Sequence, residues 1–125
     1  MKELIRYLSV FSVMLLFLHE FDAFYHREWK MFAFLKKLSE KQQYMLFLYV
    51  HIPLTLFLFY YLWSVMFFSN NILWITVNGV FILHFLIHVV ALKWKSNVFT
   101  SIHSFIFIAG MALLGAVNMC LMPFY

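Results

Sequence analysis

Four apolar runs, each long enough to cross a lipid bilayer, dominate the sequence. They cover residues 4–25, 44–68, 72–92 and 98–122. A helix of about 20 residues crosses ~30 Å of hydrocarbon, because each residue adds about 1.5 Å along the axis. A chain in lipid must also pair its own backbone N–H and C=O groups, which a single span achieves only as a helix. We therefore expect an all-α integral membrane four-helix bundle, formed as a single transmembrane domain over residues 1–125.

The composition leaves too little polar surface for a soluble domain. Hydrophobic residues make up 66% of the chain and charged residues only 11%, whereas soluble domains carry about 25% charged residues. The lipid bilayer is therefore the first partner that the sequence predicts. The formal net charge of +4 does not indicate nucleic acid, because the basic residues lie between the apolar runs. A single cysteine, Cys120, excludes an internal disulfide.

The connections between the runs predict further structure and an orientation. Residues 27–43 interleave aromatic and leucine side chains with lysines, a pattern typical of a short interfacial helix between the first and second spans. Ser96 or Asn97 is a natural N-cap for the last helix. Four antiparallel spans leave Lys2 and Arg6 as the only basic residues on the side of the termini. The positive-inside rule then makes the first and third connections cytoplasmic and puts both termini outside.

The six histidines, and the two carboxylates within the first run, all lie toward the predicted cytoplasmic ends of the runs. Residues three or four apart share a helix face, which groups His19 with Asp22 and His84 with His88. An ionisable group in hydrocarbon costs about 2.5–3.5 kcal/mol on insertion scales, so such groups face the bundle interior and pair there. We expect one interior cluster drawn from the six histidines and two carboxylates at this level: His19, Glu20, Asp22, His26, His51, His84, His88 and His103.

Imidazole combined with carboxylate is a ligand set that suits iron, zinc or manganese. A bound cation would also explain how carboxylates stay ionised away from water. We therefore predict a divalent metal site that can serve hydrolytic or oxidative chemistry on a lipid-soluble substrate. Glu20 would be the general base or a further ligand. The predicted ligands are His19, Asp22, His51, His84, His88 and His103.

Two other interpretations of the cluster stay open. A b-type haem takes one axial imidazole from each of two helices. His51 or His103 can supply the first, and either of the two histidines of the third run the second. Alternatively, the cluster is structural or carries protons in a non-catalytic component that works with a partner subunit. A small-residue stripe within residues 109–116 also allows a homodimer, although packing inside the chain is its first explanation.

A known family shares the motif around the first histidine. The segment His19-Glu20-Phe21-Asp22-Ala23, followed after four residues by Glu28-Trp29, resembles the signature H-E-x-D-A-x4-E-W of an uncharacterised family of small bacterial four-helix membrane proteins. A more distant similarity is to the membrane family named for an H-x-x-E-E motif, with Ala23 in place of the final glutamate. The resemblance implies a bacterial inner (plasma) membrane protein of unknown function. It puts on motif positions the residues His19, Glu20, Asp22, Glu28, His51, His84 and His88.

Overall fold

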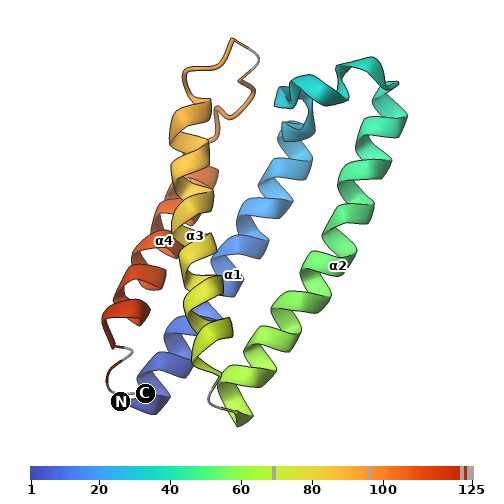
Figure 1. Cartoon of the computed structure of the whole chain (residues 1–125). Helices are drawn as coiled ribbons and strands as arrows, with labels where there is room; N and C mark the ends of the chain where they lie inside the picture. Colours follow the sequence, from blue (N-terminus) through green and yellow to red (C-terminus); the bar gives the residue numbers. More distant parts are fainter. Residues whose placement is uncertain (69, 96, 122, 124–125) are drawn as a thin grey trace.

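The computed structural model describes residues 1–68, 70–95, 97–121 and 123, and its described part contains helices and no strands (Figure 1). Helix α1 covers Lys2–His26, α2 Glu40–Phe67, α3 Asn71–Ala91 and α4 Ile102–Leu121. Two short 3-10 helices, η1 (Glu28–Met31) and η2 (Ala33–Lys37), join α1 to α2. All four α-helices are long and apolar enough to cross a membrane. The predicted all-α four-helix bundle is confirmed, and its helices are those of a multi-pass membrane protein.

Local contacts explain where the first three helices end or begin. Helix α1 ends at Arg27, which adopts the left-handed region with φ 56° and bonds its N–H to carbonyls of the last turn. Ser39 and Gln42 form a capping box that starts α2. The side chain of Asn70 accepts the N–H of Leu73 and caps α3. These signals confine the connection between α1 and α2 to the two short 3-10 helices.

The start of α4 differs from the sequence prediction. Instead of capping a helix, Asn97 accepts the N–H of Phe99, and this local turn keeps the backbone out of the helix. The side chain of Ser101 accepts the N–H of Ser104 and caps the first turn. The other predicted cap, Ser96, lies outside the described residues. Helix α4 therefore begins after a short extended segment that lies beside the helix bundle.

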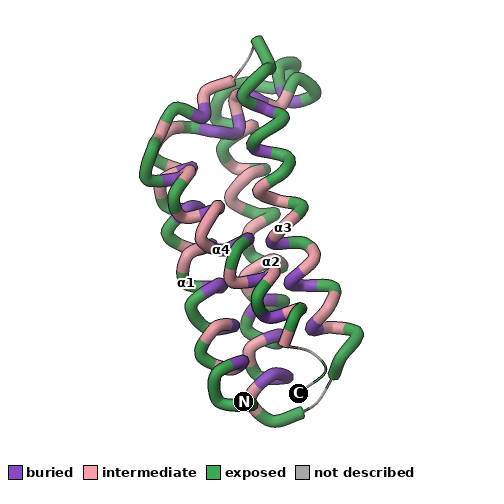
Figure 2. The backbone as a smooth tube through the Cα atoms, turned by 90° about the vertical axis from the view of Figure 1, so that its left-hand side faces the viewer, coloured by how far each residue is buried: buried purple, intermediate pink, exposed green. Residues whose placement is uncertain are grey.

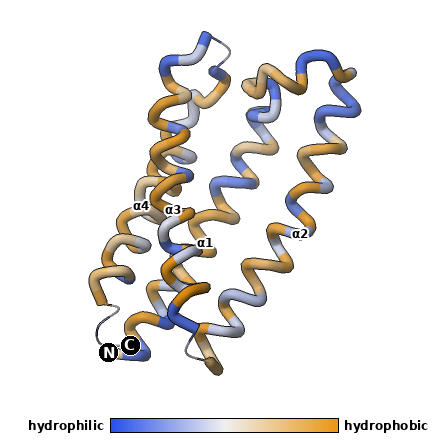
Figure 3. The backbone as a smooth tube through the Cα atoms, viewed as in Figure 1, coloured by the Kyte–Doolittle hydropathy of each residue, from blue (hydrophilic) through white to orange (hydrophobic). Residues whose placement is uncertain are grey.

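Helix α2 stands apart from the other three helices (Figure 1). Helices α1 and α3 both pack along α4. Buried side chains of this three-helix unit are Val13, Leu16, Trp74, Phe81, Ile108 and Met111. Helix α2 contributes buried apolar side chains only from its second half, at Leu58, Tyr61 and Val65. Apart from the buried Ser64, the rest of α2 is exposed or half-buried and largely apolar (Figures 2 and 3), as expected for a helix that faces lipid.

A neutral polar network joins all four helices near the N-terminal end of α1. The Tyr61 hydroxyl donates to Ser9 Oγ at 3.1 Å and accepts from Asn78 Nδ2 at 3.2 Å. Asn118 Nδ2 lies 3.3 Å from both Ser9 Oγ and Asn78 Oδ1. A Cβ added at Gly115 would lie 3.2 Å from the backbone oxygen of Asn78, so α3 and α4 approach closely here. The small residues of α4 thus serve packing within the chain.

Candidate metal centre

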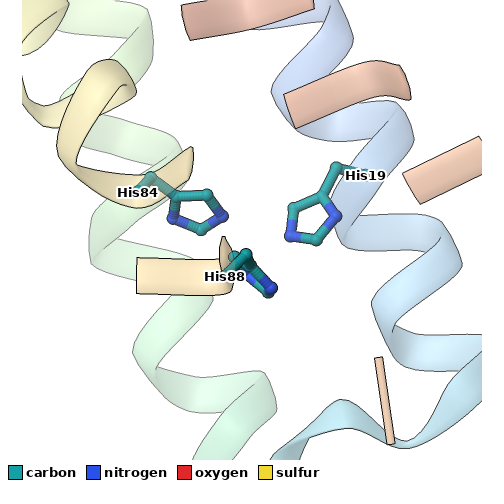
Figure 4. Close-up of side chains that lie close together, drawn as sticks. All are labelled: His19, His84 and His88. Atoms are coloured by element: carbon teal, nitrogen blue, oxygen red, sulfur yellow. The ribbon is translucent and has the colours of Figure 1, made fainter. Parts of the chain in front are cut away.

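Three histidines from two helices converge at the opposite end of the bundle. His19 lies in the last two turns of α1, and His84 and His88 lie one turn apart on α3. One ligand nitrogen from each residue lies within 4.8 Å of the other two, and Figure 4 shows the rings around a common space. His19 is 1% exposed and His88 is 5% exposed. This triad (His19, His84 and His88) can hold a metal ion.

Two ring nitrogens of the triad are buried without hydrogen-bond partners in the described part of the chain. His84 Nε2 and His88 Nδ1 have no hydrogen-bond partner among the described residues. His19 Nδ1 forms a hydrogen bond with Ser104 Oγ of α4, which leaves its Nε2 for a ligand. An unsatisfied buried polar atom costs about 1–3 kcal/mol, and a bound cation would satisfy these lone pairs together. The orphaned nitrogens therefore fit a metal site better than a self-satisfied cluster.

The extended segment before α4 covers the triad. Phe99 is 3% exposed. Its ring centroid lies 4.5 Å from that of His88 and 6.1 Å from that of His19. The aromatic ring thereby excludes water from one side of the imidazoles and restricts their rotation.

Glu20 and His51 form a pair beside the triad and link α1 to α2. Glu20 Oε2 lies 2.7 Å from His51 Nε2, and His51 Nδ1 lies 2.6 Å from the carbonyl oxygen of Phe47. Because a carbonyl only accepts, His51 Nδ1 carries a hydrogen and donates it. A single proton is then shared across the contact between Nε2 and the carboxyl group. The pair is neutral as a whole in either protonation state, which suits its position inside a membrane.

A cavity of about 350 Å³ opens beside the triad. Its polar lining consists of the triad with Glu20, Glu28 and His51. Its apolar lining comes from α1, the connecting 3-10 helices and α2: Ala23, Met31, Phe32, Phe34, Leu35, Leu46, Phe47, Val50 and Leu54. An apolar cavity with a few convergent polar groups is the usual form of a small-molecule site.

Glu28 is the second carboxyl group of this cavity. It lies in η1, outside the helices that cross the membrane, and is 2% exposed. Its Oε1 has no hydrogen-bond partner in the described part of the chain. Burial, and then the nearby carboxylates of Glu20 and Asp22, raise the pKa of Glu28 to about 8. Glu28 is therefore mainly protonated at neutral pH and adds no charge to the cavity.

The structure brings together three of the six predicted ligands and leaves three apart. His51 reaches the cavity but bonds to Glu20. Asp22 Oδ2 lies 3.3 Å from Nδ1 of His26, one turn along the same helix. His103 is exposed, because the next residue, Ser104, occupies the inward face of α4.

Sequence reasoning missed two residues at the triad, Ser104 and Phe99. A signal for Ser104 does exist, because it lies four residues before the buried Ile108 and seven before the buried Met111. This spacing marks the inward stripe of α4. Phe99 carried no such signal, since it lies in a segment without helical periodicity.

Comparisons with known proteins agree with the sequence motifs. No curated protein and no solved structure matches the chain. A family described as a family of unknown function, DUF6713, matches residues 5–124. The predicted resemblance to an uncharacterised family is confirmed, since the match spans nearly the whole chain: this chain belongs to the family of unknown function DUF6713.

Proposed function

We propose that the chain is an integral membrane metalloprotein that holds a divalent zinc, iron or manganese ion at His19, His84 and His88. The observation that carries the proposal is the convergence of three imidazole nitrogens within 4.8 Å. Tetrahedral zinc at about 2.1 Å from each nitrogen sets the nitrogens roughly 3.4 Å apart, so binding draws the rings slightly inward. Three neutral histidines leave a fourth coordination position open, as in catalytic zinc sites.

The surroundings of the triad support chemistry on a lipid-soluble substrate. A metal ion in such a site lowers the pKa of a bound water or polarises a substrate oxygen. Glu20 follows His19 in the chain and lines the same cavity, so we assign it the role of general base. His51 would hold the carboxyl group of Glu20 in position and share the proton that it accepts. The apolar cavity walls favour a substrate that enters from lipid over a soluble one.

We further propose one transmembrane domain in a bacterial plasma membrane, with the triad toward the cytoplasm and both termini outside. The basic residues other than Lys2 and Arg6 lie toward the triad end, which supports this orientation. A cysteine introduced by Lys36→Cys in a Cys120→Ser background should react with a membrane-impermeant maleimide only in inverted vesicles. Labelling in intact cells would contradict the orientation and leave the metal site unaffected.

Elemental analysis of the detergent-purified protein tests the metal site. After expression in metal-replete medium we expect about one metal ion per chain in the wild type, and far less in His84→Ala. His103→Ala is the matched control, because His103 is exposed and should leave the metal content unchanged.

Four results would count against the metal site. Substoichiometric metal in the wild type would remove it, as would equal losses in the His84→Ala and His103→Ala variants. A Soret band after haem addition would favour a haem protein instead. A structural cluster would be favoured if His84→Ala lowers the thermal stability while a chelator leaves the stability of the wild type unchanged.

A further inference from the structure

We infer that the triad cavity accepts an amphiphile with an oxyanion head and one linear apolar chain. The head would reach the metal position, and the chain would lie between α1 and α2. The inference rests on the proposed metal site and names the substrate class of that site.

The cavity opens on a surface that the bilayer would cover. Leu46 and Val50 of α2 line it and are nevertheless 42% and 56% exposed. Phe34 of η2 lines the opposite edge and is 75% exposed. These three side chains therefore form a mouth between η2 and α2, on the apolar side of the molecule. A molecule dissolved in the bilayer can enter there without crossing water.

A second, smaller cavity of about 170 Å³ lies next to the first, between α1 and α2. The two cavities share Glu20, His51 and Leu54. Apart from Glu20, His51 and Thr55, the second is lined by the apolar side chains Leu16, Phe17, Phe21, Phe24, Leu54 and Leu58. The triad and Glu28 thus line only the larger cavity, and the smaller one is mainly apolar, which matches a polar head on an apolar chain.

The charges around the triad favour an anionic head. The three imidazoles are neutral when they bind a metal, and the carboxyl group of Glu20 is already paired with His51. The charge of a divalent ion would therefore stay uncompensated by its three ligands. An oxyanion, whether the carboxylate of a fatty acid or the phosphate of a lipid, supplies the missing charge and a hard oxygen ligand.

Shape, rather than chain hydrophobicity, would select the ligand. An apolar chain loses no contact with water when it moves from lipid into the second cavity, because lipid tails are already apolar. Selection then depends on whether the chain fits between α1 and α2. We expect a linear chain to fit the second cavity of about 170 Å³ better than a bulky cage.

The experiment compares two hydroxamic acids with the same metal-binding head. The full-length protein in detergent is loaded with Co²⁺ and titrated with dodecanohydroxamic acid or adamantane-1-carbohydroxamic acid, while the cobalt d–d absorption is recorded. We expect the linear compound to change the spectrum at about tenfold lower concentration, because overpacking by a bulky group costs ~1–3 kcal/mol.

Two tryptophan variants of α2 localise the effect. Leu54→Trp should fill the junction of the two cavities and weaken the linear compound by about tenfold, with an unchanged spectrum of the cobalt protein. Leu56→Trp is the matched control, because Leu56 lies outside both of these cavities and is 65% exposed. Failure of the wild type to bind cobalt would overturn the metal site itself. Three results with cobalt bound would overturn the amphiphile and leave the metal site standing. The cobalt spectrum responds equally to both compounds, it responds to neither, or the linear compound acts on Leu54→Trp at the same concentration as on the wild type.

Discussion

Replacing Glu28 by glutamine should stabilise the metal-free protein, and the gain should grow with pH. Glu28 is 2% exposed, and its burial near Glu20 and Asp22 raises its pKa from 4.5 to about 8. The native state therefore binds a proton that the unfolded chain releases above pH 4.5. The neutral carboxyl group of Glu28 makes its full contribution to the stability of the wild type below pH 4.5, and this contribution is lost as the pH rises to about 8.

The size of the gain in stability follows from the difference between the two pKa values of Glu28. The difference between 4.5 and about 8 corresponds to about 5 kcal/mol, at ~1.36 kcal/mol per pH unit. Glutamine keeps the shape of the neutral carboxyl group and does not titrate. The Glu28→Gln variant should therefore gain little over the wild type at pH 5. The gain should level off above pH 8, at roughly 20 °C in melting temperature.

The assay is thermal unfolding in detergent with a chelator present, from pH 5 to pH 9. Glu40→Gln is the control, because Glu40 is exposed and pairs with Arg27 and Lys30 at the surface. This control should not gain stability with rising pH. If the melting temperatures of the wild type and Glu28→Gln differ by the same amount at every pH from 5 to 9, a buried neutral carboxyl group at Glu28 is refuted.

Three further predictions concern packing, the polar network and the triad. Gly115→Ala should lower stability by about 1–2 kcal/mol, because its Cβ would meet the Asn78 backbone oxygen at 3.2 Å. Gly79→Ala, where nothing lies within 4 Å, should be neutral or stabilising in the same thermal assay. Asn78→Leu should cost about 1–3 kcal/mol of unfolding free energy by removing buried hydrogen bonds to Tyr61 and Asn118, and an unchanged melting temperature would contradict this. Ser104→Ala should weaken cobalt binding about 10–100-fold in a competition titration, because it removes the partner that orients His19, whereas equal affinity would show that orientation is unimportant.

The helices and the level of the polar cluster could be predicted because both depend on local sequence. Hydropathy and run length identify a span without knowledge of its neighbours. The cost of ionisable groups in lipid, together with the spacing of His84 and His88, then predicts that they face inward. The meeting of this pair with His19 follows from their shared depth in the membrane.

The exact ligand set could not be predicted in the same way, because it depends on how each helix is rotated about its axis. Depth alone does not distinguish His103 from Ser104, and the packing of α4 turns Ser104 inward. Asp22 illustrates a local effect, since its carboxylate lies 3.3 Å from His26 Nδ1, one turn along the same helix, and does not join the triad. The separation of α2 has a similar origin, because this helix is apolar on every side and its sequence marks no buried stripe.

The triad and the neutral polar network differ in the helices that they connect. The triad lies on α1 and α3, which pack closely along α4, and Ser104 of α4 fixes the first ligand. Helix α2 contacts these helices less, and His51 is the polar side chain that it contributes to the cavity. A binding site needs ligands on rigid elements and an entrance on an element that can yield. The neutral network at Ser9 and Tyr61 anchors the far end of α2, so movement of α2 at the cavity would turn about that anchor and open the mouth without disturbing the triad.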